Sequence, residues 1–139
     1  MRSFKFAVPG KPSGKGRPRH SAGPATRHVY SPDVGSFQAR VAAFAAQADP
    51  TCFEGAVQVT IRVERRMPTS WSKKRRKAAL GCPATGKPDV ANVIASVHDG
   101  LNGIGYHDDA QVAYTALRRI WSEQDVTMIV VREVGYEQH

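Results

Sequence analysis

The stretch Lys87-Pro88-Asp89-Val90-Ala91-Asn92, with Leu101-Asn102-Gly103 and Asp108-Asp109-Ala110-Gln111-Val112 beyond it, is the most informative part of this chain. Four of the chain's 12 carboxylate side chains lie in this acidic segment, residues 89–109: Asp89, Asp99, Asp108 and Asp109. A small acidic segment in a basic chain indicates a divalent cation held against phosphate, because Mg²⁺ prefers carboxylate and phosphate oxygens. Ala91 and Ala95 lie among these carboxylates and have no side-chain chemistry.

A helix is predicted from Asp89 to about Asn102. Asp89 follows a proline and can serve as the N-cap. Apolar residues recur at helical spacing and define one face of this helix: Val90, Val93, Ile94, Val97 and Leu101. The opposite face would carry Asn92, Ser96 and Asp99. Gly100 weakens the helix, and Asn102-Gly103 ends it.

Further elements are predicted on both sides of this helix. Alternating apolar residues predict strands over residues 3–8 and 56–66, and two further strands are expected over residues 111–121 and 126–134. An apolar stripe of Val34, Phe37, Val41 and Phe44 predicts a helix that is capped by Ser31 or Asp33 and ends near Ala48. Ser72 caps a short helix over residues 73–80. The order β-α-β-α-α-β-β, without an internal repeat, favours a single α+β domain over residues 1–139.

The net charge is +8, and it is unevenly distributed. Residues 1–80 carry 16 Lys or Arg against 4 Asp or Glu, a net of +12, whereas residues 81–139 carry 4 against 8, a net of −4. Such asymmetry indicates a polyanionic partner, and nucleic acid is the one we expect. A basic surface that serves only solubility is the alternative.

Two basic segments are candidates for contact with nucleic acid. The first is the Gly- and Pro-rich loop within residues 9–30, whose cations include Lys11, Lys15, Arg17 and Arg19. Backbone N–H groups at its glycines suit phosphate oxygens, although a flexible basic arm is an equal interpretation. The second is the run Lys73, Lys74, Arg75, Arg76 and Lys77. Five adjacent cations repel one another, which favours a nearby anion over a merely solvated helix face or a localisation tract.

Composition disfavours several other classes of protein. No apolar run approaches the ~18 residues that a membrane span needs, and the N-terminus lacks a signal-peptide core, so we expect a cytoplasmic chain. Cys52 and Cys82 have no CxxC spacing, and two reduced thiols are expected rather than a disulfide. The five histidines are scattered without HExxH spacing, which argues against zinc.

The carboxylates suggest a metal site by their order in the chain. Asp89 opens the predicted helix, and Asp108-Asp109 open the strand that follows it. A helix followed by a returning strand can bring these carboxylates together around one Mg²⁺. The spacing alone is weakly specific, because an N-cap aspartate and two aspartates in a turn are common without any metal.

Taken together, these motifs resemble a known family. Lys87-Pro88-Asp89-x-x-Asn92, Asp99-Gly100-Leu101-Asn102-Gly103 and Tyr106-His107-Asp108-Asp109-Ala110-Gln111-Val112 resemble the RusA family of Holliday-junction resolvases, in its phage-type branch of crossover junction endodeoxyribonucleases. Residues 14–19 and 67–74 resemble the same branch. The resemblance implies a small mixed sheet with about three helices and a homodimer. It also implies nicking of two symmetric strands of a four-way DNA junction with Mg²⁺, for which Mn²⁺ could substitute, in a cytoplasmic protein encoded by a bacterium, phage or prophage for DNA recombination and repair.

The resemblance also implies which residues form the site. The family's metal-binding and catalytic positions are three aspartates and a lysine, of which the first falls on Asp89 and the last on Asp109, with Asp108 beside it. The other two positions fall on Ala91 and Ala95. We therefore expect a chain that binds junctions but is inactive or weak as a nuclease. Deliberate inactivation is our hypothesis, and natural decay is the alternative.

Two rival interpretations are weighed against this one. A PD-(D/E)xK nuclease would begin at Pro88-Asp89, but no lysine follows Lys87, so its second half is missing. A non-catalytic basic nucleic-acid-binding module accounts for the cations and the alanines. It leaves Asp108-Asp109 unexplained, because carboxylates repel phosphate unless a cation lies between them.

Overall fold

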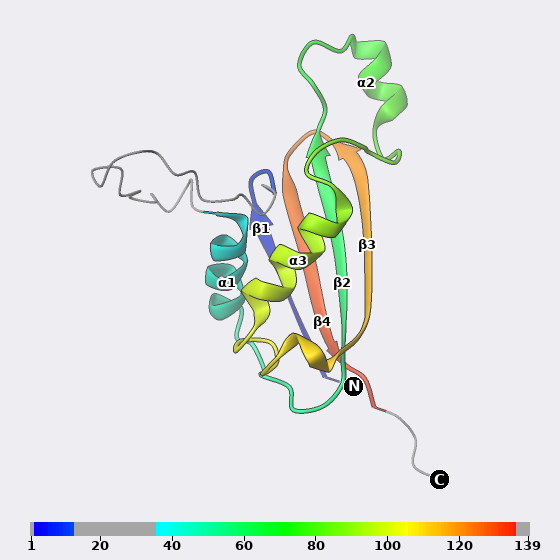
Figure 1. The fold of residues 1–139 in the computed structure, drawn as a ribbon. Helices are drawn as coiled ribbons and strands as arrows, with labels where there is room; N and C mark the ends of the chain where they lie inside the picture. Colours follow the sequence, from blue (N-terminus) through cyan, green and yellow to red (C-terminus); the bar gives the residue numbers. More distant parts are fainter. Residues whose placement is uncertain (1, 13–35, 136–139) are drawn as a thin grey trace, which may run out of the picture.

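The computed structural model describes residues 2–12 and 36–135, and Figure 1 shows their arrangement. The elements are β1 (Ser3–Pro9), α1 (Phe37–Gln47), β2 (Val57–Arg66), α2 (Lys73–Ala79), α3 (Val90–Leu101), the 3-10 turn η2 (Asp109–Gln111), β3 (Val112–Ser122) and β4 (Val126–Glu133). The predicted order of strands and helices is confirmed, and the fold class is α+β. None of the helices in the described ranges is both long and apolar enough to cross a membrane.

The four strands form one mixed sheet in the order β1-β4-β2-β3. Strand β4 pairs antiparallel with β1 and with β2, whereas β2 and β3 are parallel neighbours. A parallel pair needs a long crossover, and the segment between β2 and β3 supplies it with α2, α3 and η2. The predicted acidic segment therefore lies on this crossover.

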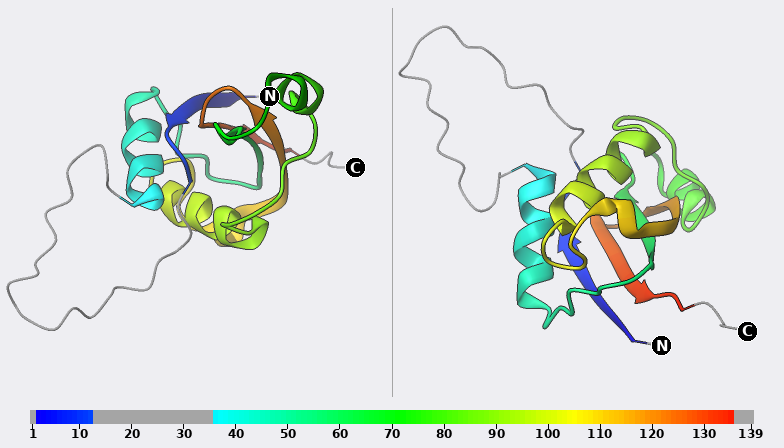
Figure 2. Two further views of the ribbon diagram at one scale, coloured as in Figure 1. Left: turned by 90° about the horizontal axis from the view of Figure 1, so that it is seen from above. Right: turned by 60° about the horizontal axis from the view of Figure 1, so that its bottom comes forward.

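Helices α1 and α3 cover one face of the sheet, and Figure 2 shows them on the same side with α2 apart from them. Period-2 alternation turns one set of side chains from β1, β2 and β4 toward these helices. The strands contribute Phe4, Phe6, Val8, Val57, Val59, Ile61, Val63, Ile129 and Val131 to the core. The helices contribute Phe37, Val41, Ala45, Val93, Val97 and Leu101.

The two helices approach closely at Gly100. A Cβ atom there would lie 2.8 Å from the carbonyl oxygen of Gln38 and 2.8 Å from a Cγ atom of Val41. Only a glycine lets the backbones meet at this distance. The sequence predicts that Gly100 weakens the helix, and the structure shows that its missing side chain is what allows α1 and α3 to pack.

Three local predictions were wrong. Ser36 is the N-cap of α1, with its hydroxyl 3.1 Å from the amide of Ala39, so Ser31 and Asp33 lie before the helix and outside the described residues. Val90 is 38% exposed rather than buried. Ser96, expected on the solvent face of α3, is 1% exposed, so the buried face is rotated relative to the predicted one.

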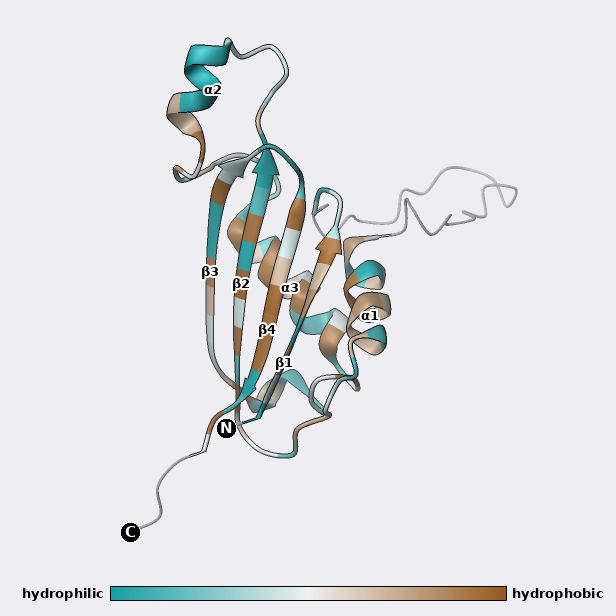
Figure 3. Ribbon diagram, turned by 180° about the vertical axis from the view of Figure 1, so that it is seen from behind, coloured by the Kyte–Doolittle hydropathy of each residue, from teal (hydrophilic) through white to brown (hydrophobic). Residues whose placement is uncertain are grey.

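The other face of the sheet has no helix of the described residues in front of it (Figure 3). Cross-strand rows on this open face mix apolar and charged residues. One row runs from Lys5 through Val130 and Thr60 to Ala116, and the next from Ala7 through Met128 and Arg62 to Arg118. Arg62 also lies 3.1 Å from the carboxylate of Glu64, which neutralises much of its charge.

We predict that Gly100→Ala destabilises the fold by about 1–3 kcal/mol, because a methyl group forces apart two packed helices. The free energy of unfolding by urea measures the effect. Gly55→Ala is the matched control, since nothing lies within 4 Å of a Cβ atom at that position. An equal stability for the two variants would contradict the close approach at Gly100.

Candidate active site

Asp89 caps the first turn of α3. Its Oδ1 accepts a hydrogen bond from the amide of Asn92 at 2.9 Å, which confirms the predicted N-cap. Arg119 of β3 donates from one nitrogen to the carbonyl oxygens of Gly86 and Pro88, at 2.7 Å each. The loop that leads into Asp89 is therefore fixed from both sides, by the helix and by β3.

Asp108 and Asp109 occupy the turn that leads into β3. Asp108 is the N-cap of η2, and its carboxylate accepts from the amide of Ala110 at 3.2 Å. Asp109 is exposed, yet its pKa is raised, first by a hydrogen bond shared with the Asp108 carboxyl and then by desolvation and the Asp108 charge. Two exposed carboxyl groups this close disfavour full ionisation, and a bound cation would relieve the repulsion.

The charges of Asp109 and Asp99 also act on groups at the last turn of α3. His98 Nε2 is 2.9 Å from the hydroxyl of Thr115. Burial lowers the pKa of His98, whereas the negative charges of Asp109 and Asp99 act to raise it by a smaller amount. The hydroxyl of Tyr106 donates to the carbonyl of His98 at 3.1 Å. Burial raises the pKa of Tyr106, and the charges of Asp109 and Asp99 raise it further. Asp99 and Asp109 therefore act on the same groups.

The acidic segment is thus divided between the two ends of α3. Asp89 begins the helix at the end nearer α2, whereas Asp109 lies in η2, beyond the helix's C-terminal end (Figure 1). Among the described residues, no group of three or more His, Cys, Asp and Glu side chains is arranged to hold a metal ion. The joint use of Asp89, Asp108 and Asp109 around one ion stays a prediction.

The surface of α3 between these two ends carries the alanines. Residues 91, 95 and 99 are spaced by four, so their side chains stack along one side of the helix. Ala91 is exposed and Ala95 is half-buried. An aspartate at 91 and a lysine at 95 would extend from the Asp89 end toward Asp99 and Asp109.

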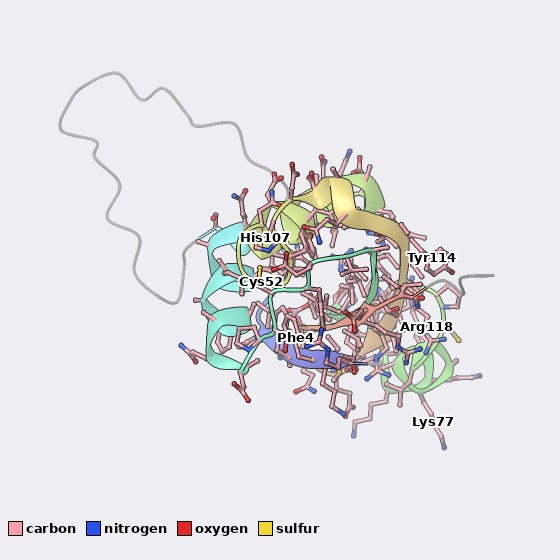
Figure 4. The ribbon with its side chains drawn as sticks, turned by 90° about the horizontal axis from the view of Figure 1, so that it is seen from below. Phe4, Cys52, Lys77, His107, Tyr114 and Arg118 are labelled. Carbon is pink, nitrogen blue, oxygen red and sulfur yellow. The ribbon has the colours of Figure 1, made fainter. Side chains whose placement is uncertain are left out.

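A second polar group borders the Asp108-Asp109 turn. Nε2 of His107 lies 3.0 Å from a carboxylate oxygen of Glu54, and its Nδ1 lies 3.8 Å from the sulfur of Cys52. Figure 4 shows His107 and Cys52 close together. Cys52 and Cys82 are both free, which confirms the predicted thiols.

The predicted cationic helix forms a lobe at the end of the sheet. Ser72 caps α2, as predicted, and accepts from the amide of Arg75 at 3.1 Å. Trp71 packs edge-on against Trp121 of β3 with 5.0 Å between ring centroids, and Arg75 lies 3.9 Å from the Trp71 ring centroid. These contacts fix the lobe to the sheet. A hollow of about 360 Å³ on it is lined by Met67, Lys73, Arg76, Lys77, Leu80 and Glu123.

The first basic segment is described only at its start. Lys11 is exposed, and its carbonyl oxygen accepts from Arg40 of α1 at 2.7 Å. Lys15, Arg17 and Arg19 lie outside the described residues, so their assignment to DNA stays a prediction. Of the two arginines in β3, Arg119 holds the 86–88 loop and Arg118 lies on the open face.

Sequence reasoning missed the residues that hold the site together. Gln111 makes four hydrogen bonds around the Asp108-Asp109 turn, and Arg119 makes two around the loop before Asp89. One signal was present: Gln111 is three residues after Asp108, the spacing of a capping box, which the structure contains. No local pattern marks Arg119, because its partners lie more than thirty residues earlier.

The sequence of this chain matches the model of a known family. The model of the endodeoxyribonuclease RusA family matches residues 9–132, so the chain belongs to the RusA family and the predicted resemblance is confirmed. The family is one of nucleases that resolve Holliday junctions, as members of DNA recombination pathways. The chain is also 38% identical over 142 residues to the "Uncharacterized protein YqaN" of Bacillus subtilis (strain 168), a match that covers 97% of this chain and 99% of YqaN.

Proposed function

We propose that this chain binds four-way DNA junctions as a homodimer and carries a Mg²⁺-dependent nicking site that Ala91 and Ala95 leave impaired. The observation that supports this most directly is the side of α3 between Asp89 and Asp109, which carries those two alanines. A metal–phosphate site needs oxygen ligands and a cation for the phosphate along this side. The chain retains the carboxylates at both ends and lacks the groups between them.

The adjacent carboxylates of Asp108 and Asp109 suit a hard cation. Asp108 and Asp109 are exposed, adjacent and mutually repelling, as the raised pKa of Asp109 indicates. We propose Asp109 and Asp108 as metal ligands at this turn, and we retain Asp89, at the other end of α3, as a ligand on the family resemblance. Bound Mg²⁺, or Mn²⁺ in its place, would activate water and neutralise charge on the scissile phosphodiester. The chain's own residues orient the carboxylates and hold the DNA.

The two alanines account for impairment. Without an aspartate at 91, carboxylates from the two ends of α3 have no ligand between them. Without a lysine at 95, no ammonium group lies beside the phosphate to stabilise charge in the transition state. Loss of one such donor commonly costs about 10²–10³ in rate.

We predict that the chain binds a synthetic four-way junction more tightly than linear duplex and does not cut it in Mg²⁺. Ala91→Asp combined with Ala95→Lys should restore cleavage by at least about 10²-fold over the unaltered chain, with junction affinity little changed. A plasmid cruciform reports paired nicking, because two coordinated nicks give a linear product. Parallel reactions in Ca²⁺ measure binding without cleavage.

The single variants Ala91→Asp and Ala95→Lys serve as controls, since each restores only one group. A restored chain that binds junctions and never cuts them would favour the alternative, a non-catalytic basic nucleic-acid-binding module. Calorimetric titration with Mg²⁺ separates the two, because such a module has no specific uptake at Asp89 and Asp109. Equal affinity for duplex and junction would contradict junction recognition.

We propose that the α2 lobe and the basic loop bind the arms of the DNA junction. Lys73, Lys74, Arg75, Arg76 and Lys77 extend from a lobe that Trp71 and Trp121 fix to the sheet. Figure 4 shows Lys77 projecting away from the sheet. Because the backbone of the lobe is already fixed, it need not be ordered when the cations bind phosphate. Lys11, Lys15, Arg17 and Arg19 would contact further phosphates from the loop.

We predict that Lys73→Gln combined with Lys77→Gln weakens junction binding. The slope of log affinity against log salt should become shallower by about 0.9 for each phosphate that the variant no longer neutralises. The measurement is a binding titration at several salt concentrations. Arg2→Gln is the control, because it removes a cation at the opposite end of the sheet, where Arg2 pairs with Glu133 at 3.0 Å. An equal slope change per cation in both variants would contradict a specific role for α2.

We propose that the second copy in the homodimer binds the open face of the sheet. A two-fold dimer gives a two-fold junction two equivalent sites. Val130, Met128 and Ala116 lie at neighbouring positions on this face, beside a hollow of about 450 Å³, and the Arg62–Glu64 pair lessens its charge. A half-apolar surface without a helix over it suits self-association better than α1, whose exposed side faces away from the sheet.

We predict that Val130→Lys converts the dimer to a monomer near 15.2 kDa, because it sets like charges against each other across the two-fold axis. Light scattering during size-exclusion chromatography gives the mass. Ala46→Lys on the exposed side of α1 is the matched control and should leave the dimer intact. A dimer that survives Val130→Lys would move the interface elsewhere.

A further inference from the structure

Gln111 connects two segments that are more than fifty residues apart in the sequence. Its Oε1 accepts from the amides of His107 at 2.7 Å and Asp108 at 3.1 Å. Its Nε2 donates to the carbonyl oxygens of Phe53 and Gly55, at 2.8 Å each. A primary amide has two donor hydrogens and one oxygen with two lone pairs, so every hydrogen-bonding capacity of Gln111 is used.

These bonds connect the Asp108-Asp109 turn to the hydrophobic core. Phe53 is 1% exposed, and its backbone forms a bridge with Tyr106, which is fully buried. The chain at 53–55 is therefore fixed, and Gln111 fixes the turn against it. The 3.0 Å contact between His107 and Glu54 is a second, exposed link between the same two segments.

The turn needs such an anchor because of what it carries. Asp108 and Asp109 are adjacent and exposed, and two adjacent carboxylates repel each other. Repulsion of this kind would open a short unanchored turn and separate the two carboxyl groups. Gln111 binds the backbone of the turn through the two amides that precede Asp109, and so holds the chain in place against that repulsion.

We propose that Gln111 is a positioning residue of the proposed active site, which holds the Asp108-Asp109 turn against the 53–55 segment so that the Asp109 carboxylate stays near the last turn of α3 with Asp108 beside it. This inference rests on the proposed function. Gln111 itself touches neither metal nor DNA in this scheme. A merely structural cap would affect stability alone, whereas a positioning residue affects what the carboxylates bind.

The first experiment tests the anchor in the chain as it stands. Gln111→Met keeps the length of the side chain and removes all four hydrogen bonds. Hydrogen exchange measured by NMR should accelerate roughly fivefold or more at the amides of His107 and Asp108. Gln124→Met, in the exposed turn between β3 and β4, should leave these two amides unchanged. Unchanged exchange in Gln111→Met would overturn the anchor.

The second experiment tests positioning in the background restored by Ala91→Asp and Ala95→Lys. Gln111→Met should weaken Mg²⁺ affinity in calorimetry, and slow single-turnover cleavage, by about 10–100-fold, as loss of a group that orients a metal ligand does. Junction affinity in Ca²⁺ should stay within about twofold, because the DNA-binding cations lie elsewhere. Gln111→Glu keeps oxygen acceptors for the two amides and should fall between Gln111→Met and the parent.

The two hypotheses fail in different ways. The chain restored by Ala91→Asp and Ala95→Lys, called the parent, tests the proposed function. The difference between this parent and its Gln111→Met variant tests the role of Gln111. A parent that takes up Mg²⁺ without cutting junctions refutes the function, and Mg²⁺ affinity still decides the role of Gln111. Unchanged Mg²⁺ affinity and cleavage in a folded Gln111→Met variant overturn positioning. A parent that takes up no Mg²⁺ overturns both.

Discussion

The packing of α3 against α1 and the sheet is the interaction on which the rest of the structure depends. Val93, Val97 and Leu101 are fully buried, and Gly100 removes the side chain that would hold α1 away. Large-to-small changes in such a core typically cost about 2–5 kcal/mol, so this packing sets the position of α3 firmly. Because Asp89 caps one end of α3 and Asp109 lies near the other, the same packing sets the distance between the acidic positions.

Strand β3 completes this arrangement from the edge of the sheet. Its Arg119 holds the loop before Asp89, and Gln111, immediately before the strand, holds the turn of Asp108 and Asp109. Trp121, near the other end of β3, receives Trp71 and so fixes the basic lobe. Strand β3 is parallel to β2 and cannot slide without breaking its register with that strand. It therefore fixes the positions of the two acidic ends of α3 relative to the cations of α2.

The sequence was sufficient for what local periodicity and capping determine. Alternation predicted the first two strands, and Ser72 and Asp89 were recognised as caps because Ser and Asp accept hydrogen bonds from exposed helix N–H groups. It was insufficient where tertiary packing decides. Ser96 looks polar and is buried, Val90 looks apolar and is exposed, and Gly100 reads as a helix breaker although it serves a helix contact. The Gln111 bonds to Phe53 and Gly55, and the Arg119 bonds, join backbone distant in the sequence, which no local spacing reveals.

The positions of Ala91 and Ala95 explain why the fold does not depend on catalytic side chains at these two positions. Neither contributes to the buried core, and alanine has the highest helix propensity of any residue, so α3 loses nothing from having it there. The groups that position the site, Gln111 and Arg119, bond to backbone and do not depend on residues 91 or 95. The framework that orients the acidic ends therefore persists without the groups between them. Under the proposed function, such a chain would keep the shape and charge that bind DNA, whereas the step that needs a filled metal–phosphate site would be removed.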